Sequence, residues 1–194
     1  MERNIALEPV TSERCADALR VLGAGPDQPH CTCQYWRFSS GDFGRMSQLE
    51  RIAALEQQAG LQPAPGMIAY VDGEPAGWCG FGVRQLMGRL VRSRTIPQID
   101  DIPAWSIFCF VVRTGYRRQG LAKMLLDGVV DYGRRLGAPA LEAYPIDPQG
   151  KRVSTSFAYV GTVSMFEAAG FEKVMETQSK SAGLPRWLMR LHLV

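Results

Sequence analysis

A short basic segment in front of a helical pattern carries the most specific chemistry in this sequence. Its residues are Arg117, Arg118, Gln119, Gly120, Leu121 and Ala122. The first N–H groups of a helix have no internal partner, and the helix dipole favours negative charge there. Gly120 has no Cβ to keep a phosphate away from the backbone, and the two arginines add cationic donors. The segment predicts an anion site, although an ordinary helix start with exposed arginines also fits these residues.

Two other phosphate-binding motifs are excluded by the residues around Gly120. A P-loop requires Gly-Lys followed by Ser or Thr, whereas Gly120 is followed by Leu121 and Ala122. A dinucleotide fingerprint needs further glycines at fixed spacings, and this turn lacks them. We therefore expect the anion to be bound by a turn of another kind.

The elements on either side of this segment are predicted from their hydrophobic patterns. Residues 105–112 form the most apolar run, which is typical of a strand buried on both faces. From Gly120 the apolar residues follow a helical period, and Gly137 is expected to end the helix. The face of this helix predicted to be buried carries Leu121, Met124, Leu125, Gly128, Val129, Tyr132 and Leu136.

The rest of the chain alternates between helical and strand patterns. The predicted order is a helix capped by Thr11 or Ser12 and ended by Gly23, an irregular stretch at 23–44, a helix at 46–59, strands at 67–71 and 76–83 around the turn Asp72-Gly73, an ambiguous stretch at 86–102, the strand at 105–112, the helix from Gly120, a strand at 140–144, a helix at 159–169, a strand from Phe171 and a strand at 187–193. This order predicts a mixed α/β sheet in a single domain over residues 1–194.

The basic segment and its surroundings resemble the GNAT superfamily of N-acetyltransferases. The segment matches the pattern Arg/Gln-x-x-Gly-x-Gly/Ala, residues 112–117 resemble the family's strand end with its Tyr-Arg entry, and residues 165–171 resemble its late helix ending in Gly-Phe. The clear resemblance covers residues 104–174. It implies an α/β (α+β mixed) GNAT fold, a central twisted mixed sheet of about six or seven strands flanked by about four helices. It also implies acetyl-CoA-dependent N-acetyltransferase activity.

The resemblance also assigns residues to the cofactor. In such proteins the pantetheine lies against the end of the buried strand and pairs with its backbone, which here means Phe110, Val111 and Val112. The pyrophosphate would lie over the basic segment, which comprises Arg117, Arg118, Gln119, Gly120, Leu121 and Ala122. Acetyl-CoA is therefore expected as a co-substrate, and no metal is expected.

The catalytic positions depart from the family pattern. Many relatives carry a Tyr as the acid where this chain has Phe166, and some carry a Glu as the base where it has Ser106. The segment around Glu142 resembles a third arrangement, in which the Glu is the base, and a structurally paired carboxylate is the alternative. Tyr159 and Tyr144 are candidates for the acid, beside protonation of the thiolate by solvent.

The acceptor pocket is expected between residues 31–37 and 149–157, by analogy with the family. Tyr35 and Trp36 would form an aromatic wall with a polar tip, and a packed loop pinned by these two side chains is the alternative. Ser106 could orient a water molecule there but is a poor base. These three residues are the candidate acceptor contacts.

Cys109 raises the alternative of an acyl-cysteine mechanism. Strand alternation places its side chain on the opposite face from Ser106, Phe108 and Phe110. No histidine adjoins it in the sequence to activate it as a nucleophile. We therefore expect Cys109 to be a core residue.

Composition excludes several classes of function. The net charge of +3 is lower than a nucleic-acid-binding domain usually carries, so no nucleic acid is expected. The five cysteines, an odd number, argue against a closed disulfide framework, and His30, Cys31 and Cys33 lack the second ligand pair of a zinc site. No apolar stretch is long enough to cross a bilayer and the first residues resemble no secretory signal, so a cytoplasmic location and no membrane partner are expected.

The expected acceptor is a primary amine of a small molecule, such as an amino acid derivative, a polyamine or an antibiotic. A peptide or protein amine is the alternative within the same activity, although the pocket residues show no acidic cluster that would suit a polycation. A non-catalytic sensor or partner module that binds coenzyme A is the alternative of another class, and Phe166 keeps it open. Association into a homodimer is common for the fold and is kept by analogy only.

Overall fold

One mixed sheet organises the computed structural model, which describes residues 3–25, 31–151, 153–154 and 158–193. Its seven strands are β1 (Ile5–Pro9), β2 (Gly66–Val71), β3 (Glu74–Val83), β4 (Trp105–Val112), β5 (Ala140–Ala143), β6 (Glu172–Ser181) and β7 (Leu184–His192). They lie in the order β1-β2-β3-β4-β5-β7-β6, and only the neighbours β4 and β5 are parallel. The predicted mixed α/β sheet is confirmed.

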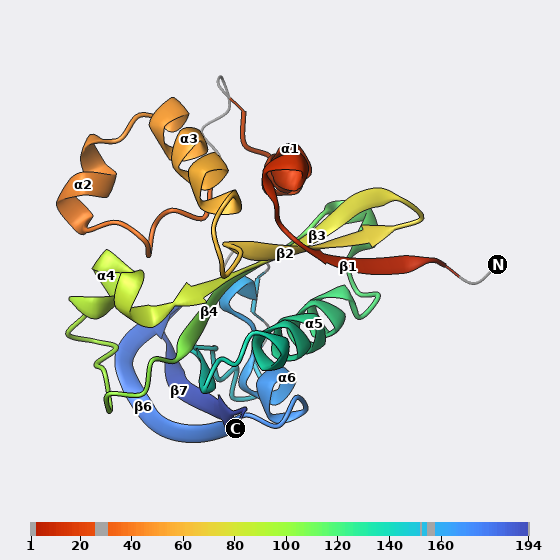
Figure 1. Cartoon of the computed structure of the whole chain (residues 1–194). Helices are drawn as coiled ribbons and strands as arrows, with labels where there is room; N and C mark the ends of the chain where they lie inside the picture. The colour runs from red at the N-terminus through yellow and green to blue at the C-terminus, as the bar shows by residue number, and fades with distance from the viewer. Residues whose placement is uncertain (1–2, 26–30, 152, 155–157, 194) are drawn as a thin grey trace.

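Helices cover both faces of this sheet (Figure 1). The α-helices are α1 (Cys15–Leu22), α2 (Ser40–Arg45), α3 (Gln48–Ala59), α4 (Gly88–Val91), α5 (Leu121–Arg135) and α6 (Val163–Glu167). The helices α1 and α3 pack on one face in a core cluster that contains Leu55 and Trp78. On the other face α5 and α6 pack in a second cluster, around Val129 and Phe166.

Several predicted element boundaries were wrong. The helix α2 lies inside a stretch predicted to be irregular, and β1 was not predicted. The predicted helix at 159–169 is broken, because Gly161 adopts a left-handed backbone with φ of 78° between a 3-10 turn (Ala158–Val160) and α6. The helix α3 starts two residues later than predicted, where Ser47 and Glu50 form a capping box.

The buried face of α5 also differs from the prediction. Met124 and Leu136 are 37% and 41% exposed. Leu126, Val130 and Gly133 are buried instead, beside the correctly predicted Leu121, Leu125, Val129 and Tyr132. The buried residues follow i, i+4 steps along the helix, so the buried face is rotated from the predicted one at Met124 and Leu136.

A β-bulge in β4 reverses the predicted alternation of its side chains. Gly80 pairs with Cys109 and Phe81 pairs with Ile107, so Phe108 is an extra residue in the ladder. Phe108 and Cys109 consequently belong to the same core cluster, while Phe110 belongs to the cluster on the α5 face. The prediction that Cys109 lies opposite Phe108 was therefore wrong, although Cys109 is buried.

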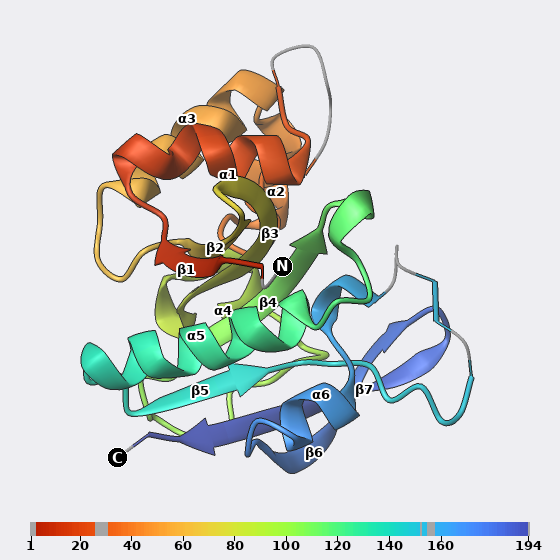
Figure 2. The same cartoon turned by 90° about the vertical axis from the view of Figure 1, so that its right-hand side faces the viewer.

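The parallel strands β4 and β5 separate along their length (Figure 2). Their pairing is confined to three positions, Trp105 to Ile107 of β4 against Leu141 to Ala143 of β5. The pairing of β4 with β3 continues to Val112, so the second half of β4 has a strand neighbour on one side only. The first turn of α5 lies at this open end of β4 (Figure 2).

Three further observations concern the residues described. Every cysteine is free of a disulfide. No group of three or more His, Cys, Asp or Glu side chains is placed to hold a metal ion within the described ranges, which do not include His30. None of the helices in those ranges has the length and apolar character needed to cross a bilayer.

Candidate functional site

A large cavity lies at the open end of β4. Its volume is about 1640 Å³, and its walls come from β4, the turn before α5, residues 31–36, the α4 region and the β6–β7 hairpin. A pocket for one small ligand usually has a volume of roughly 300–1000 Å³. The cavity is therefore large enough for two substrates at once.

The turn before α5 presents a series of unbonded backbone N–H groups. Arg118 and Gly120 adopt left-handed backbone conformations, with φ of 60° and 80°. Within the part of the chain that the structure describes, no backbone N–H from Arg118 to Lys123 donates to another residue. Such a series at a helix N-terminus is suited to binding a phosphate.

The space in front of Gly120 is open. A Cβ placed on Gly120 would meet no atom within 4 Å, so the backbone can be approached from the cavity. Nearby, the Nε of Arg117 donates a hydrogen bond of 2.9 Å to the carbonyl oxygen of Val112, which fixes the turn against the end of β4. The geometry thus fits the pyrophosphate of a coenzyme A-type ligand.

Most of the residues expected to contact the cofactor line this cavity. They are Phe110, Val111, Val112, Arg117, Arg118, Gly120, Leu121 and Ala122. Gln119 is not among the lining residues; its side chain donates to the carbonyl oxygen of Gly115 at 3.2 Å and accepts a hydrogen bond from Arg3. Any contact between the cofactor and Gln119 would therefore involve its backbone.

Glu142 lies outside this cavity, in a buried network of charges. It is 2% exposed and accepts hydrogen bonds from Arg190 and from the hydroxyl of Tyr144, the latter at 3.0 Å. The Nη1 of Arg84 lies 3.8 Å from its Oε2. A carboxylate surrounded by two guanidinium groups and shielded from the cavity is poorly placed to accept a proton from a substrate, so the geometry favours the paired-carboxylate alternative.

Two more predicted site residues belong to the same network. The hydroxyl of Tyr144 lies 2.8 Å from the Oγ of Ser106 and accepts a hydrogen bond of 2.6 Å from Arg84. Ser106 and Tyr144 are buried, and neither lines the cavity. Burial raises the pKa of Tyr144, with the neighbouring carboxylate of Glu142 as the next cause. Ser106 and Tyr144 therefore belong to the buried hydrogen-bond network and not to the lining of the cavity.

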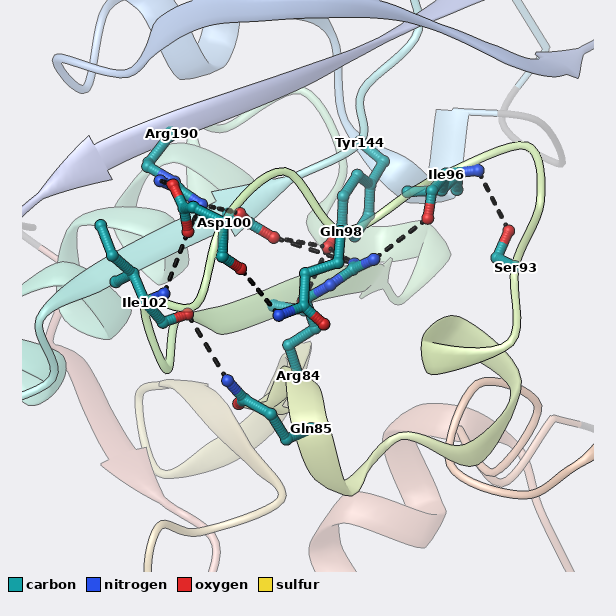
Figure 3. Close-up of polar contacts among 11 residues, drawn as sticks. Arg84, Gln85, Ser93, Ile96, Gln98, Asp100, Ile102, Tyr144 and Arg190 are labelled. Atoms are coloured by element: carbon teal, nitrogen blue, oxygen red, sulfur yellow. Dashed lines mark hydrogen bonds and ion pairs between the residues drawn. The ribbon is translucent and has the colours of Figure 1, made fainter.

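A second anchor of the network is the loop that precedes β4. The guanidinium of Arg190 also binds the carboxylate of Asp100, with its Nη2 3.0 Å from Oδ1, and the Nη2 of Arg84 donates 3.0 Å to the carbonyl of Ile96 (Figure 3). Hydrogen bonding to Arg190 lowers the pKa of Asp100. The network thus connects the 3-10 turn that follows β3 (Arg84–Leu86) and the strands β4, β5 and β7 with the irregular segment at 93–102.

Tyr159, by contrast, lines the cavity. It lies in the 3-10 turn beside β4, and burial raises the pKa of its hydroxyl. A phenol with a raised pKa stays protonated at neutral pH, which is the state that a proton donor requires. Of the candidate acids, Tyr159 has the suitable position.

Phe166 occupies the position where many relatives carry a Tyr, and it is fully buried. Its ring lies edge-on to Phe171 and Phe110, with centroid distances of 5.0 and 6.1 Å. Phe166 therefore packs in the core on the α5 side of the sheet, against Phe110 of β4. It has no group that could donate a proton.

Two aromatic residues predicted to contact the acceptor lie at the cavity. Tyr35 and Trp36 both line it, with their rings edge-to-face at 5.2 Å, and Phe43 packs against Tyr35 at 5.7 Å. The guanidinium of Arg89 lies 3.9 Å from the centroid of the Tyr35 ring, and its Nε donates to the Tyr35 carbonyl. Of the other predicted acceptor region, residues 149–157, positions 152 and 155–157 lie outside the described residues.

One lining residue was missed in the sequence. Arg186 of β7 lines the cavity and is 4% exposed. The sequence signal that could have found it is an arginine at a strand position where a buried apolar residue is expected. Alternation along β7 buries Leu184, Arg186 and Leu188. Burial lowers the pKa of Arg186.

The cavity combines a turn suited to binding a phosphate with the unpaired end of β4, where β4 and β5 diverge. The sequence model of the Acetyltransferase (GNAT) family matches residues 32–152, so the chain belongs to the acetyltransferase (GNAT) family. A search of curated proteins gives no significant match.

Solved structures with the same fold have low sequence identity to this chain. The structure of yncA, a putative acetyltransferase from Salmonella typhimurium with its cofactor acetyl-CoA, is 18% identical with a TM-score of 0.58, covering 98% of this chain and 94% of that one. An acetyltransferase of the GNAT family from Streptococcus pneumoniae is 17% identical with a TM-score of 0.57, covering 97% and 99%. The ribosomal-protein-S18-alanine N-acetyltransferase of Escherichia coli is 14% identical with a TM-score of 0.53, covering 98% and 94%. These likenesses confirm the fold.

Proposed function

We propose that this protein transfers the acetyl group of acetyl-CoA to a primary amine of a small molecule, directly and within a ternary complex. The observation that carries the proposal is the single cavity that joins the phosphate-binding turn to the aromatic wall. The turn and the unpaired side of β4 fit the cofactor, and the remaining volume beside Tyr35 and Trp36 fits an acceptor. The solved yncA structure, which has acetyl-CoA bound, supports the choice of donor.

Binding of the donor would use backbone groups more than side chains. The N–H groups from Arg118 to Lys123 would bind the pyrophosphate, with Arg117 and Arg118 adding charge. Phe110, Val111 and Val112, whose backbones face no strand on the β5 side, would pair with the pantetheine. Holding the thioester and the amine together in this way accounts for a large part of the rate enhancement in direct transfer.

The transfer step forms a bond between the amine nitrogen and the acetyl carbon and breaks the bond between that carbon and sulfur. The electron pair of the C–S bond leaves on sulfur, and Tyr159 would donate its hydroxyl proton to this thiolate and regain one from solvent. The nitrogen releases its extra proton to water. A backbone N–H at the end of β4, such as that of Val112, would polarise the thioester carbonyl.

No carboxylate or imidazole lines the cavity among the described residues. In this proposal the amine arrives neutral or loses its proton to water, and positive charge in the walls favours this by lowering the pKa of a bound amine. Glu142 has no part in this proposal, because it lies outside the cavity in its own ion pairs.

A thiol-release assay with acetyl-CoA and a panel of small primary amines and peptides tests the proposal. We expect free coenzyme A to appear only with an amine, and mass spectrometry to find one acetyl group on it. Turnover of peptides alone would favour a peptide or protein N-acetyltransferase. Tight binding of acetyl-CoA with no thiol release from any amine would establish the non-catalytic module instead. A cytoplasmic location and a homodimer stay predictions.

A further inference from the structure

Arg186 has an unpartnered charged group at the wall of the cavity. Its Nε donates 2.8 Å to the carbonyl oxygen of Tyr144 and its Nη1 donates 3.3 Å to the Oγ of Ser179. Its Nη2 is buried and has no hydrogen-bond partner within the described part of the chain. Leaving a buried charged donor unpaired is unfavourable, because the group has lost its water without gaining a partner.

Arg190, on the same strand, is a buried arginine whose charge is compensated by carboxylates. Arg190 forms ion pairs with Glu142 and Asp100, and hydrogen bonding to Asp100 raises its pKa. Arg186 forms no ion pair among the described residues, and burial lowers its pKa. The two arginines lie four positions apart on one face of β7, so the difference comes from their surroundings: Arg190 faces carboxylates, whereas Arg186 faces the cavity.

The whole cavity has the same sign of charge. Its described lining contains eight cationic side chains and no Asp or Glu: Arg51, Arg89, Arg92, Arg117, Arg118, Lys123, Lys180 and Arg186. Arg117, Arg118 and Lys123 belong to the phosphate-binding turn and the first turn of α5. The others lie on separate elements, so the phosphates bound at the turn do not account for them.

Arg186 lies on the acceptor side of this lining. The electrostatic neighbours that affect its pKa include Tyr159, the proposed proton donor, and Tyr35 of the aromatic wall. A ligand group bound by Arg186 would thus be near the reacting amine and away from the turn that binds the pyrophosphate. A guanidinium with free N–H donors is best matched by a planar carboxylate, which can accept two hydrogen bonds at once.

We propose that the acceptor carries a carboxylate beside its amine, as an amino acid does, and that Arg186 binds this carboxylate. The inference rests on the proposed function and narrows it to one substrate class. It disfavours polyamines, because an added polycation would meet five like charges beyond the phosphate-binding turn and the first turn of α5, and no carboxylate lines the described cavity. The carboxylate would accept a hydrogen bond from the Nη2 of Arg186, which has no partner among the described residues.

The test compares acceptors that differ only in the carboxylate. The common L-amino acids, their C-terminal amides and the corresponding decarboxylated amines are assayed by thiol release with the full-length protein. We expect the carboxylates to be preferred in kcat/KM by roughly 10- to 100-fold, the value of a charge-assisted hydrogen bond pair. Equal use of an amino acid and its amide by the wild-type protein would overturn the inference while leaving the acetyltransferase activity in place.

Variants of Arg186 add a second readout. R186Q should raise KM for the carboxylates by roughly 10- to 100-fold, remove the preference over amides and leave the Kd of acetyl-CoA unchanged, and R186K should retain part of the preference. Arg134, an exposed cation on α5, provides the control R134Q, which should behave as the wild type. Equal losses with amino acids and amides in R186Q would point to a structural role and overturn the inference.

The inference can also be judged if no amine is acetylated, which would refute the proposed function. Calorimetry of the complex with coenzyme A, titrated with the same amino acids and amides, then gives the answer. Binding of the carboxylates that is lost in R186Q supports a carboxylate site at Arg186. Binding of neither series, or of both equally, overturns it. Retained affinity for coenzyme A shows that each variant is folded.

Discussion

The Nε of Arg186 donates a hydrogen bond of 2.8 Å to the carbonyl oxygen of Tyr144, while the hydroxyl of Tyr144 donates to Glu142. One residue therefore connects a wall of the cavity to the buried charge network. The network also holds Ser106 of β4 through the same hydroxyl. Glu142 thus affects the site through the position of Tyr144, and its removal should be seen first in stability.

The variant E142Q tests this structural role. Arg190 and Arg84 would lose the charge that compensates them in a buried environment, so we expect the free energy of unfolding to fall by about 3 kcal/mol. Denaturant unfolding measures this, with the half-exposed Glu167 giving the control E167Q. At a temperature where E142Q is folded, its pH–rate profile should match the wild type. A stable variant with an altered rising limb would instead restore Glu142 as the base.

The variant Y159F tests the proposed proton donor. Removing the hydroxyl should lower kcat by about 10²- to 10⁴-fold, the range typical of a lost general acid, while the Kd of acetyl-CoA stays the same. Steady-state kinetics and calorimetry measure these two quantities. Y70F is a suitable control, because Tyr70 bonds Asp17 at 2.8 Å and is not part of the cavity lining. Full activity in Y159F would assign protonation of the thiolate to solvent.

The elements around the proposed cofactor site could be predicted because their determinants are local in sequence. A strand, a turn with Gly120 and a helix follow one another without interruption, and each has its own hydrophobic period. The strand at 105–112 was predicted with the bounds it has in the structure. The proposed phosphate site uses mainly backbone groups, so its prediction depends on the identity of few side chains.

The acceptor half could not be predicted in the same way, because contacts between distant segments define it. The ladder of β4 gains an extra residue at Phe108 through its pairing with β3, which no pattern inside β4 reveals. The isolation of Glu142 depends on Arg84, in the 3-10 turn after β3, and on Arg190 of β7. The proposed role of Arg186 depends on its three-dimensional surroundings, which contain no ion-pair partner for it among the described residues. Of these residues, family resemblance gave a motif position for Glu142 only.

The variant G120V tests the phosphate-binding turn. At φ of 80° a β-branched side chain is strained, and its Cβ would project into the open space in front of the backbone. We expect the Kd of acetyl-CoA to rise by about 10-fold or more through lost phosphate hydrogen bonds, as measured by calorimetry. Gly115 is a matched control, since a Cβ there also meets no atom within 4 Å and its φ is not left-handed. If G120V and G115V bound acetyl-CoA equally well, the turn would not be the pyrophosphate site.

The pH dependence of the reaction follows from the groups that line the cavity. With no carboxylate or imidazole in its described walls, the rising limb of kcat/KM should follow the ionisation of the acceptor amine and shift when an amine of different pKa is used. Because burial raises the pKa of Tyr159 above the ordinary value of about 10, this residue stays protonated as the pH rises and should cause no fall in rate below about pH 10. Measuring kcat/KM from about pH 6 to 10 with two amines of different basicity separates the contributions. A rising limb at one fixed pH for both amines would contradict this prediction and reveal a base on the protein.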